Sequence, residues 1–395
     1  MTLVVLGADA AVARAAATLP VDVVHVRLPG AAPLDAPAVA HHAVDYQHGP
    51  TFLAFVDEVL RPLSPAAVVS LTELGLEPAA VAARRLGAAG APPQAVRATR
   101  DKLEMRRVLE RSAPHLNPPF AAGDDAEAVA RLFGADRGPK APVVAKPVAG
   151  TGSNAVTLLR SAADLPEDRR TRATLLERYV GGREYSVETL SSGGRHTCLG
   201  IAEKRTEGEA FVEVAHLMPA PSLDAAGRRR VERAVAELLD AVGLTDGPAH
   251  TEVKVDGARV TVIETHNRPG GDGIPDLVRL TRGVDWRRAA LGWPVGVGPR
   301  EEPEEAVAAA AATVFVTAPP GRVAAVAPRP APTGWRLVGW DVPVEPGDPV
   351  SPLRSSADRL GMAVLTADGT RACADAVDEL RSRTIVTTHP PEDGA

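Results

Sequence analysis

The segment Val260–Asp272, VTVIETHNRPGGD, gathers metal- and phosphate-binding side chains at one loop. It begins as a β-branched apolar run that is typical of a strand, and it ends in a glycine-rich turn. Glu264, His266 and Arg268 follow one another at alternate positions along this exit, and Asp272 lies just beyond them. A carboxylate, an imidazole and a guanidinium delivered to one loop predict a site for a metal ion and a phosphate group.

The geometry of a predicted hairpin decides whether a second carboxylate, that of Glu252, can reach the same site. The segments on either side of Asp256-Gly257 read as strands joined by a two-residue turn. A strict hairpin of this kind would set Glu252 opposite Thr261 and put Glu264 on the other face. Both glutamates can share a metal only if the connection has three residues or a bulge shifts the register. We therefore predict such a turn or bulge.

A strand-end lysine and a glycine loop form the second candidate element. Pro142–Pro147 is a short apolar strand that carries Lys146 near its end, and Ala149–Asn154, AGTGSN, follows at once. The backbone N–H groups of such a loop can fold over phosphates, with the lysine charge beside them. No Gly-Lys-Ser/Thr closes the loop, so it is not a Walker A loop. Lys102, on a predicted helix Thr99–Arg111, would by itself be a surface lysine.

Other polar positions allow a functional or a structural interpretation. Glu184 and Glu188 share one strand face by period-two alternation, either as an exposed sheet face or as site carboxylates. Glu213 and His216 lie close together on another predicted strand. Glu73 follows a buried strand at its carboxyl end, where ligands bind in parallel sheets. It is either a substrate contact or a solvated loop carboxylate.

The N-terminal segment predicts a parallel α/β domain. Leu3–Leu6 and Val21–Val26 read as buried strands, and Ala10–Leu19 between them reads as an alanine-rich helix. Gly7 is a single glycine where the dinucleotide fingerprint requires three, so close approach of a pyrophosphate is not expected. A structural Rossmann-like domain is favoured over an NAD-binding one.

A long helix is expected in the catalytic body, and a smaller unit is expected after it. Leu223–Gly243 is a long amphipathic helix, and the acidic run Glu301–Glu305 reads as a solvated helix start or a linker. Short strands rich in proline and glycine then precede a helix at Ala372–Arg381. We expect a small α+β appendage packed on the catalytic body, and a disordered tail after Thr387.

Composition limits the classes of function. The 395 residues suggest two or three domains, and the net charge of -6 provides no basic field for nucleic acid. The two cysteines, Cys198 and Cys373, stand apart from any metal-binding pattern and favour a reducing compartment. No segment has the length of a membrane span or the pattern of a signal peptide. We expect a soluble, cytoplasmic protein without membrane or nucleic-acid partners.

Together and in this order, these elements resemble the ATP-grasp superfamily of carboxylate–amine ligases. The resemblance rests mainly on VVAKPVAGTGS, LLERYVGGREYSVE and HTEVKVDGARVTVIETHNRPGGD. Further segments are similar to the L-amino acid ligase and carnosine-synthase-like branch, namely RDKLEMRRVL, FVEVAHLMPAP, PGRVAAV and VEPGDPVSPLRSSADRLGMAV. It implies an α/β and α+β multidomain fold. The expected parts are a Rossmann-like pre-ATP-grasp domain (1–97), an ATP-grasp domain (98–300, with a lid at about 120–185) and a C-terminal L-amino acid ligase-type subdomain (301–395).

The resemblance also implies a role for each matching residue. ATP would be bound by Lys102, Lys146, the lid residues Gly150, Thr151, Gly152 and Ser153, the adenine hinge Glu177, Arg178, Tyr179 and Val180, and the ribose acid Glu184. The metal carboxylates would be Glu252 and Glu264, and the catalytic cations Arg268 and Lys146. The substrate residues would be Glu73, Glu213, His216, Arg268, Gly270 and Gly271.

One position departs from the family pattern. The usual motif has asparagine two residues after the second glutamate, whereas this chain has His266 there and Asn267 next. Because Mg²⁺ prefers oxygen ligands, either His266 is not a ligand, or Asn267 replaces it through a local bulge, or a water intervenes. His266 therefore stands beside Glu252 and Glu264 as the unresolved candidate for the metal site.

The activity implied is ATP- and Mg²⁺-dependent (or Mn²⁺-dependent) ligation of a carboxylate to an amine through an acyl phosphate. A homodimer is allowed by the same resemblance. Three alternatives stay open: an ATP-grasp carboxylating or acyl-phosphate-forming enzyme whose acceptor is not an amine, an ATP-sensing scaffold without turnover, and an NAD-dependent dehydrogenase.

Overall fold

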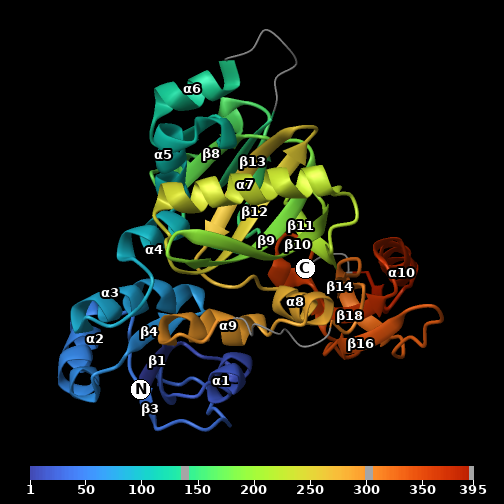
Figure 1. Cartoon of the computed structure of the whole chain (residues 1–395). Coiled ribbons are helices and arrows are strands. Elements are labelled where there is room, and N and C mark those ends of the chain that lie inside the picture. Colours follow the sequence, from blue (N-terminus) through green and yellow to red (C-terminus); the bar gives the residue numbers. More distant parts are fainter. Residues whose placement is uncertain (135–141, 299–305, 391–395) are drawn as a thin grey trace.

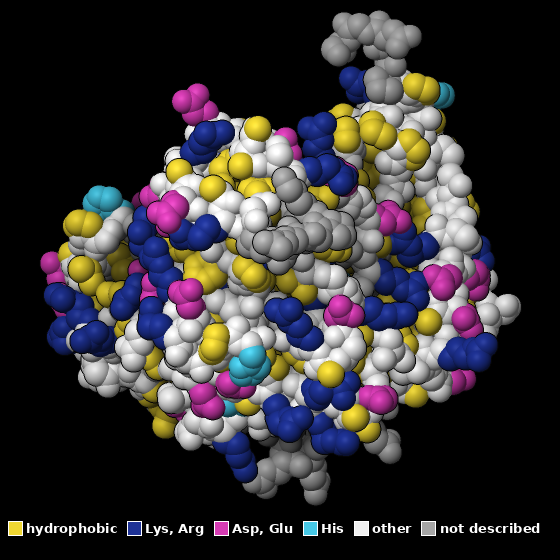
Figure 2. All heavy atoms as spheres, turned by 90° about the horizontal axis from the view of Figure 1, so that it is seen from above, with side chains coloured by type: hydrophobic (Ala, Val, Ile, Leu, Met, Phe, Trp, Pro, Cys, Tyr) yellow, Lys and Arg dark blue, Asp and Glu magenta, His cyan; other side chains and the backbone are white. Residues whose placement is uncertain are grey.

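The computed structural model describes residues 1–134, 142–298 and 306–390, so the predicted acidic linker Glu301–Glu305 lies outside the described residues. Figure 1 shows the N-terminal unit and the helices that cover it at one end of the molecule. The largest sheet occupies the middle, a small lid unit lies at the other end, and the C-terminal strands flank the large sheet. On the face in Figure 2, basic and acidic side chains are interspersed. None of the described helices is both long and apolar enough to cross a membrane.

The N-terminal sheet is parallel, as the β-α-β pattern predicts. Its strand order is β3-β2-β1-β4, so the chain crosses over between β3 and β4. One face packs on α1 and on α9 (Trp286–Gly292), and the other packs on α2 and α3, with each face burying its own apolar cluster. The elements are β1 (Thr2–Leu6), α1 (Ala10–Ala17), β2 (Asp22–Arg27), β3 (Ala40–Ala43), α2 (Gly49–Phe55), β4 (Ala67–Ser70) and α3 (Leu76–Leu86).

Two helices follow where the sequence predicts one. The chain forms α4 (Pro93–Arg100) and α5 (Lys102–Ser112), separated at Asp101. Asp101 has an extended backbone, and its side chain accepts a hydrogen bond from the Glu104 backbone N–H at 2.8 Å. This N-cap starts a new helix, and Lys102 therefore lies at a helix N-terminus instead of mid-helix.

The central sheet has eight antiparallel strands in the order β13-β12-β9-β10-β11-β14-β18-β16. Helices α4, α5 and α7 bury a cluster on one face, and α8 and α9 bury another on the opposite face. The remaining elements of this body are β9 (Arg183–Ser192), β10 (Arg195–Glu207), β11 (Val212–Met218), α7 (Ala225–Val242), β12 (Gly247–Asp256), β13 (Arg259–His266), α8 (Ile274–Arg282) and α9 (Trp286–Gly292).

A four-stranded sheet with one helix forms the lid unit. Its strand order is β5-β8-β6-β7, and α6 packs on it through the side chains of Val129 and Leu132. The elements are β5 (Phe120–Ala122), α6 (Ala126–Gly134), β6 (Val143–Pro147), β7 (Thr157–Leu159) and β8 (Thr174–Arg178). The connection from β8 to β9 joins this unit to the central sheet.

The C-terminal strands pack on the catalytic body, as expected, and three of them also continue its sheet. Strands β14, β18 and β16 extend the central sheet, because β14 pairs with β11 at Ala215↔Val314. Only β17, β15 and β19 form a small sheet of their own, and β19 includes Thr387, so the chain is ordered to His389. The elements are β14 (Ala310–Val316), β15 (Gly321–Val326), β16 (Arg336–Asp341), β17 (Pro349–Val350), β18 (Gly361–Ala367), α10 (Thr370–Ser382) and β19 (Val386–His389).

Candidate active site

One cavity collects most of the predicted site residues, where the lid unit faces the central sheet. Its lining includes the predicted residues Lys102, Lys146, Gly150, Thr151, Gly152, Ser153, Glu177, Arg178, Tyr179, Val180, Glu184, Glu213, Glu252 and Glu264. The predicted residues that lie outside this lining are Glu73, His216, His266, Arg268, Gly270 and Gly271.

The predicted bulge in the β12–β13 hairpin is confirmed. The turn residues are Gly257-Ala258, one position later than expected, because Asp256 pairs with Arg259. The register then shifts between Glu252 and Val253, so that Ile263 is the extra residue and Glu252 lies directly opposite Glu264. Directly paired residues of an antiparallel ladder point to the same face. The bulge therefore places both carboxylates on the cavity side of the hairpin.

A buried arginine supports this bulge. The side chain of Arg106 on α5 is fully buried and donates to the Val262 carbonyl at 2.9 Å and to the Ile263 carbonyl at 2.7 Å. It also donates to the Glu177 carboxylate and to Asn117 Oδ1. Backbone carbonyls at a bulge can lack partners in the strand ladder. Here the Arg106 guanidinium donates hydrogen bonds to them. Sequence reasoning missed this residue, although it lies one helical turn after Lys102 on the same face.

Two lysines hold charge beside the paired glutamates. Lys102 Nζ lies 2.6 Å from the Gly150 carbonyl and 3.2 Å from Glu264 Oε2, while Lys146 Nζ lies 2.8 Å from Glu177 Oε2. Burial lowers the pKa of Lys146, and Arg106 and Lys102 lower it further against the effect of Glu177. Both ammonium groups line the same cavity as the glycine loop, an arrangement suited to phosphate.

The glycine loop has the backbone that its residues allow. Gly150, Gly152 and Ser153 have φ values of 130°, 71° and 55°, so the loop needs residues that tolerate positive φ. The Gly152 carbonyl accepts a hydrogen bond from the Ser356 backbone N–H at 3.1 Å. The C-terminal strands thus deliver a loop that touches the predicted lid.

The hinge end of the cavity is aromatic. The rings of Tyr179 and Phe211 stack with centroids 5.6 Å apart, and Lys254 Nζ lies 4.8 Å from the Tyr179 ring centroid. Lys254 also donates to the Val180 carbonyl at 3.2 Å and lies 3.6 Å from Glu184 Oε2. Flat apolar surfaces with polar groups beside them suit an adenine ring. Phe211 and Lys254 were not predicted as site residues.

His266 lies between two carboxylates. Its Nε2 atom is 3.1 Å from Glu264 Oε1, and its Nδ1 atom is 3.4 Å from Glu73 Oε2. Arg268 Nε donates to the same Glu73 oxygen at 3.0 Å, so a loop of the N-terminal sheet reaches this corner of the site. Burial would raise the pKa of Glu73, but His266 and Arg268 bring it well below its usual range. Asn267 points elsewhere, because its amide donates to the Pro248 carbonyl at 2.7 Å.

His250 contacts Glu252 in the same way as His266 contacts Glu264. His250 Nε2 lies 3.3 Å from Glu252 Oε1, and His250 Nδ1 lies 2.5 Å from Glu188 Oε1. Glu188 also accepts from the Trp286 indole at 2.5 Å and from the Gly270 backbone N–H at 3.0 Å. Burial lowers the pKa of His250, but the two glutamates raise it to about 9. The pattern His-x-Glu on β12, mirrored by Glu-x-His on β13, was visible in the sequence and was not used.

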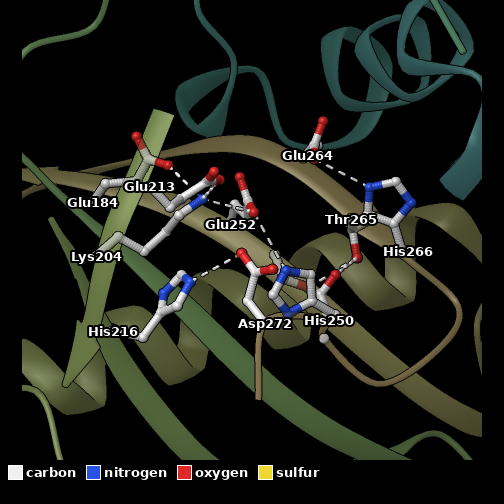
Figure 3. Close-up of polar contacts among 12 residues, drawn as sticks. Glu184, Lys204, Glu213, His216, His250, Glu252, Glu264, Thr265, His266 and Asp272 are labelled. Carbon is white, nitrogen blue, oxygen red and sulfur yellow. Dashed lines mark hydrogen bonds and ion pairs between the residues drawn. The ribbon is translucent and has the colours of Figure 1, made fainter. Parts of the chain in front are cut away.

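The predicted amine-pocket residues have different partners. Glu213 Oε2 accepts from the Ser356 hydroxyl at 3.1 Å, whereas His216 Nε2 lies 3.4 Å from Asp272 Oδ2. Arg359 donates to both Asp272 oxygens, at 2.7 and 2.8 Å. Figure 3 shows His216 and Asp272 pointing toward each other beside the carboxylates of the cavity. Ser356 and Arg359 come from the part of the chain after residue 305, to which sequence reasoning assigned no site residue.

The carboxylates of Glu252 and Glu264 suit magnesium, but further oxygen ligands would have to come from a bound nucleotide or from water. Burial would raise the pKa of Glu252 and of Glu264, but Lys204 and Lys102 respectively lead the groups that lower both values, so both are carboxylates. Carboxylate oxygens are the ligands that Mg²⁺ prefers, with phosphates and water completing the octahedron. Among the described residues, no three His, Cys, Asp or Glu side chains are arranged to hold a metal by themselves. A nucleotide phosphate would have to share the ion.

Comparisons with known proteins agree with this geometry. Residues 139–276 match the family described as "ATP-grasp domain", and residues 314–389 match "L-amino acid ligase C-terminal domain 2". The first match shows that the chain contains an ATP-grasp domain, which confirms the resemblance drawn from the sequence. The second match adds an L-amino acid ligase C-terminal domain after it.

Individual relatives are similar over part of their length. Carnosine synthase 1 of Gallus gallus is 28% identical over 281 residues, which is 65% of this chain and 30% of that protein. An alanine–anticapsin ligase of Bacillus amyloliquefaciens is 26% identical over 272 residues, or 60% of this chain and 56% of that protein. The chain thus spans about a third to about half of these curated relatives. The crystal structure of an L-amino acid ligase from Bacillus licheniformis superposes over 99% of both chains with a TM-score of 0.77 at 19% identity, which shows a shared fold.

Proposed function

We propose that the chain is an ATP-dependent ligase that joins the carboxylate of an amino acid to the amine of a second amino acid. The products would be an amide or dipeptide, ADP and phosphate. The observation that carries the proposal is the bulge-aligned pair Glu252 and Glu264, which faces the cavity beside Lys102, Lys146 and the glycine loop. The three parts of the chain would be 1–97, 98–300 and 301–395.

In the first step a substrate carboxylate oxygen attacks the γ-phosphorus of ATP, and the bond to ADP breaks. Negative charge accumulates there, and Lys102, Lys146 and Arg268 would neutralise it, while Gly270 and Gly271 would border the carboxylate. Glu252 and Glu264 would hold Mg²⁺, which supplies further positive charge at the phosphates when it is bound. The hinge Glu177–Val180 would bind adenine.

In the second step the amine attacks the acyl carbon, and phosphate leaves as the amide bond forms. A free α-amine is mostly protonated at neutral pH, so a base must take a proton. Glu213 and His216 are the candidates at this end, with Glu73 as a contact to the substrate on the N-terminal side. Acyl phosphates hydrolyse readily, and closure of the loop at Gly150–Ser153 would exclude water.

The test is a matrix of amino acids offered in pairs, scored by ADP release and then by mass spectrometry of the product. We expect ADP release that requires both an acid and an amine, with one amide formed for each ADP. Glu252→Gln and Glu264→Gln should each abolish it while the fold is kept. ADP release with an acid alone, without any amide, would favour an acceptor other than an amine. Absence of turnover with every pair would favour a nucleotide-binding scaffold.

A further inference from the structure

Lys204 on β10 is a buried cation in contact with carboxylates that line the cavity. Its Nζ atom lies 2.8 Å from Glu184 Oε1, 3.0 Å from Glu213 Oε1 and 2.8 Å from Glu252 Oε1. The side chain of Lys204 is only 1% exposed. Figure 3 shows the three carboxylates converging on this one ammonium group. A lysine ammonium has three N–H donors, and each of them here has a carboxylate partner.

These four residues come from four neighbouring strands. The sheet order β12-β9-β10-β11 places Glu252, Glu184, Lys204 and Glu213 side by side. All three carboxylates line the main cavity. In the proposed function Glu184 faces the ribose, Glu252 the metal and Glu213 the amine. One ammonium therefore touches a residue of each of the three ligand positions.

Each of the three glutamates also has a second partner that the other two do not contact. Lys204 is the partner that all three have in common. Glu184 lies 3.6 Å from Lys254, Glu213 accepts from the Ser356 hydroxyl at 3.1 Å, and Glu252 lies 3.3 Å from His250. Burial alone would lower the pKa of Lys204, but the three carboxylates raise it well above its usual range. Three carboxylate oxygens within 3.0 Å of Nζ therefore hold Lys204 as an ammonium cation.

We propose that Lys204 is a built-in cation of the site, a positioning residue that holds the ribose, metal and amine carboxylates in one fixed arrangement. This inference rests on the ligand positions of the proposed function. Three largely buried carboxylates without a common counter-ion would repel one another and the nucleotide phosphates. Lys204 removes part of that repulsion before any metal binds. The residue thus makes nucleotide binding less dependent on Mg²⁺ than the carboxylates alone would allow.

The test measures ADP binding by calorimetry, once with saturating Mg²⁺ and once with the metal chelated. For the intact protein and for Lys204→Met, the ratio of the two dissociation constants gives the metal dependence. We expect Lys204→Met to raise this ratio about tenfold, the scale that Coulomb's law gives for one unit charge several ångströms away. The added Mg²⁺ would then replace the missing charge.

Lys254→Met is the matched control. Lys254 also faces Glu184, but no contact joins it to Glu213 or Glu252 among the described residues. It should weaken ADP binding by a similar factor with and without Mg²⁺, which leaves the ratio unchanged. A purely structural role for Lys204 would have the same signature as Lys254. An unchanged ratio in Lys204→Met would therefore overturn the inference.

Circular dichroism would reveal whether Lys204→Met misfolds. A second variant keeps the inference testable in that case. Lys204→Met combined with Glu213→Gln leaves the net charge of the cluster as it is in the intact protein. Compared with Glu213→Gln alone, the double variant should still raise the metal-dependence ratio about fivefold, since Glu184 and Glu252 again lose their shared cation. Equal ratios in these two variants would also overturn the inference.

The binding measurement separates this inference from the proposed ligase activity, because it needs no turnover. If no pair of acid and amine supports ADP release, the proposed function fails, while the ratio still decides the role of Lys204. Where an amine substrate is found, Lys204→Met should raise its KM, since Glu213 is released, and Lys254→Met should not. An amine KM that rises equally in both variants would count against a link between Lys204 and the amine position.

Discussion

Replacement of Arg106 by methionine tests how the two glutamates come to face each other. The guanidinium is fully buried, and its removal takes a donor from the Val262 carbonyl and leaves the Ile263 carbonyl with Lys146 Nζ at 3.3 Å. Among the described residues, it also leaves the Glu177 carboxylate with only Lys146 as a counter-ion. Breaking a buried ion pair by removal of one partner costs about 3–5 kcal/mol, and each unsatisfied carbonyl adds about 1 kcal/mol or more.

Because these contributions overlap, we expect Arg106→Met to lower the free energy of unfolding by about 3–5 kcal/mol. Urea titrations followed by circular dichroism and by tryptophan fluorescence would measure it, with coincident transitions as the condition for the analysis. The neighbouring Arg107 is only half-buried, and Arg107→Met should stay within about 0.5 kcal/mol. Arg106→Met should also weaken Mg²⁺-dependent ADP binding, since the bulge loses its support. A stability change under about 1 kcal/mol would refute this reasoning, because it lies far below the expected loss.

Three other outcomes follow from the same structure. Asp272→Asn should lower the free energy of unfolding by about 1–3 kcal/mol at neutral pH. Burial would raise the pKa of Asp272, but its partners, Arg359 among them, bring it well below its usual range. The stabilisation should thus be complete above the ordinary aspartate pKa of about 4 and should fade in acid titrations below it; an equal loss at all pH values would contradict this. Gly270→Ala would put a Cβ 2.7 and 2.8 Å from the buried carboxylate–imidazole pair beneath it, whereas Gly271→Ala meets nothing within 4 Å. Thermal unfolding should show a loss of about 1–3 kcal/mol for the first and less than about 0.5 for the second, and equal effects would contradict the packing. Burial raises the pKa of the Cys373 thiol to about 12, so a disulfide reagent at neutral pH should not label Cys373 until the protein is denatured, and rapid labelling of Cys373 in the folded protein would contradict its burial.

The sequence predicted the local elements well because their causes are local. The alternation of Glu264 and its neighbours, the strand-end Lys146 and the glycine loop all follow from short-range patterns. The need for a bulge also followed, since a strict hairpin separates Glu252 from Glu264. The identity of the bulged residue did not, because Ile263 is held by Arg106, which lies 157 residues away in the chain.

The residues that were missed are those with long-range partners. Lys204 has no local pattern, since its meaning depends on carboxylates from three other strands. The pairing of β14 with the central sheet was also missed. Its partner strand β11 lies far earlier in the sequence, so no local pattern indicates the contact. The break at Asp101, by contrast, was within reach, because aspartate before a helical segment is a common N-cap.

The central claim is an acyl phosphate formed at the Glu252–Glu264 end of the cavity. The most direct measurement uses a substrate acid whose carboxylate carries ¹⁸O, incubated with ATP, Mg²⁺ and the amine that supports ADP release. If the carboxylate attacks the γ-phosphorus, one labelled oxygen is transferred to each phosphate released, and the other remains in the amide. Mass spectrometry of the phosphate should show this transfer in step with amide formation. Amide formed together with unlabelled phosphate would contradict the mechanism.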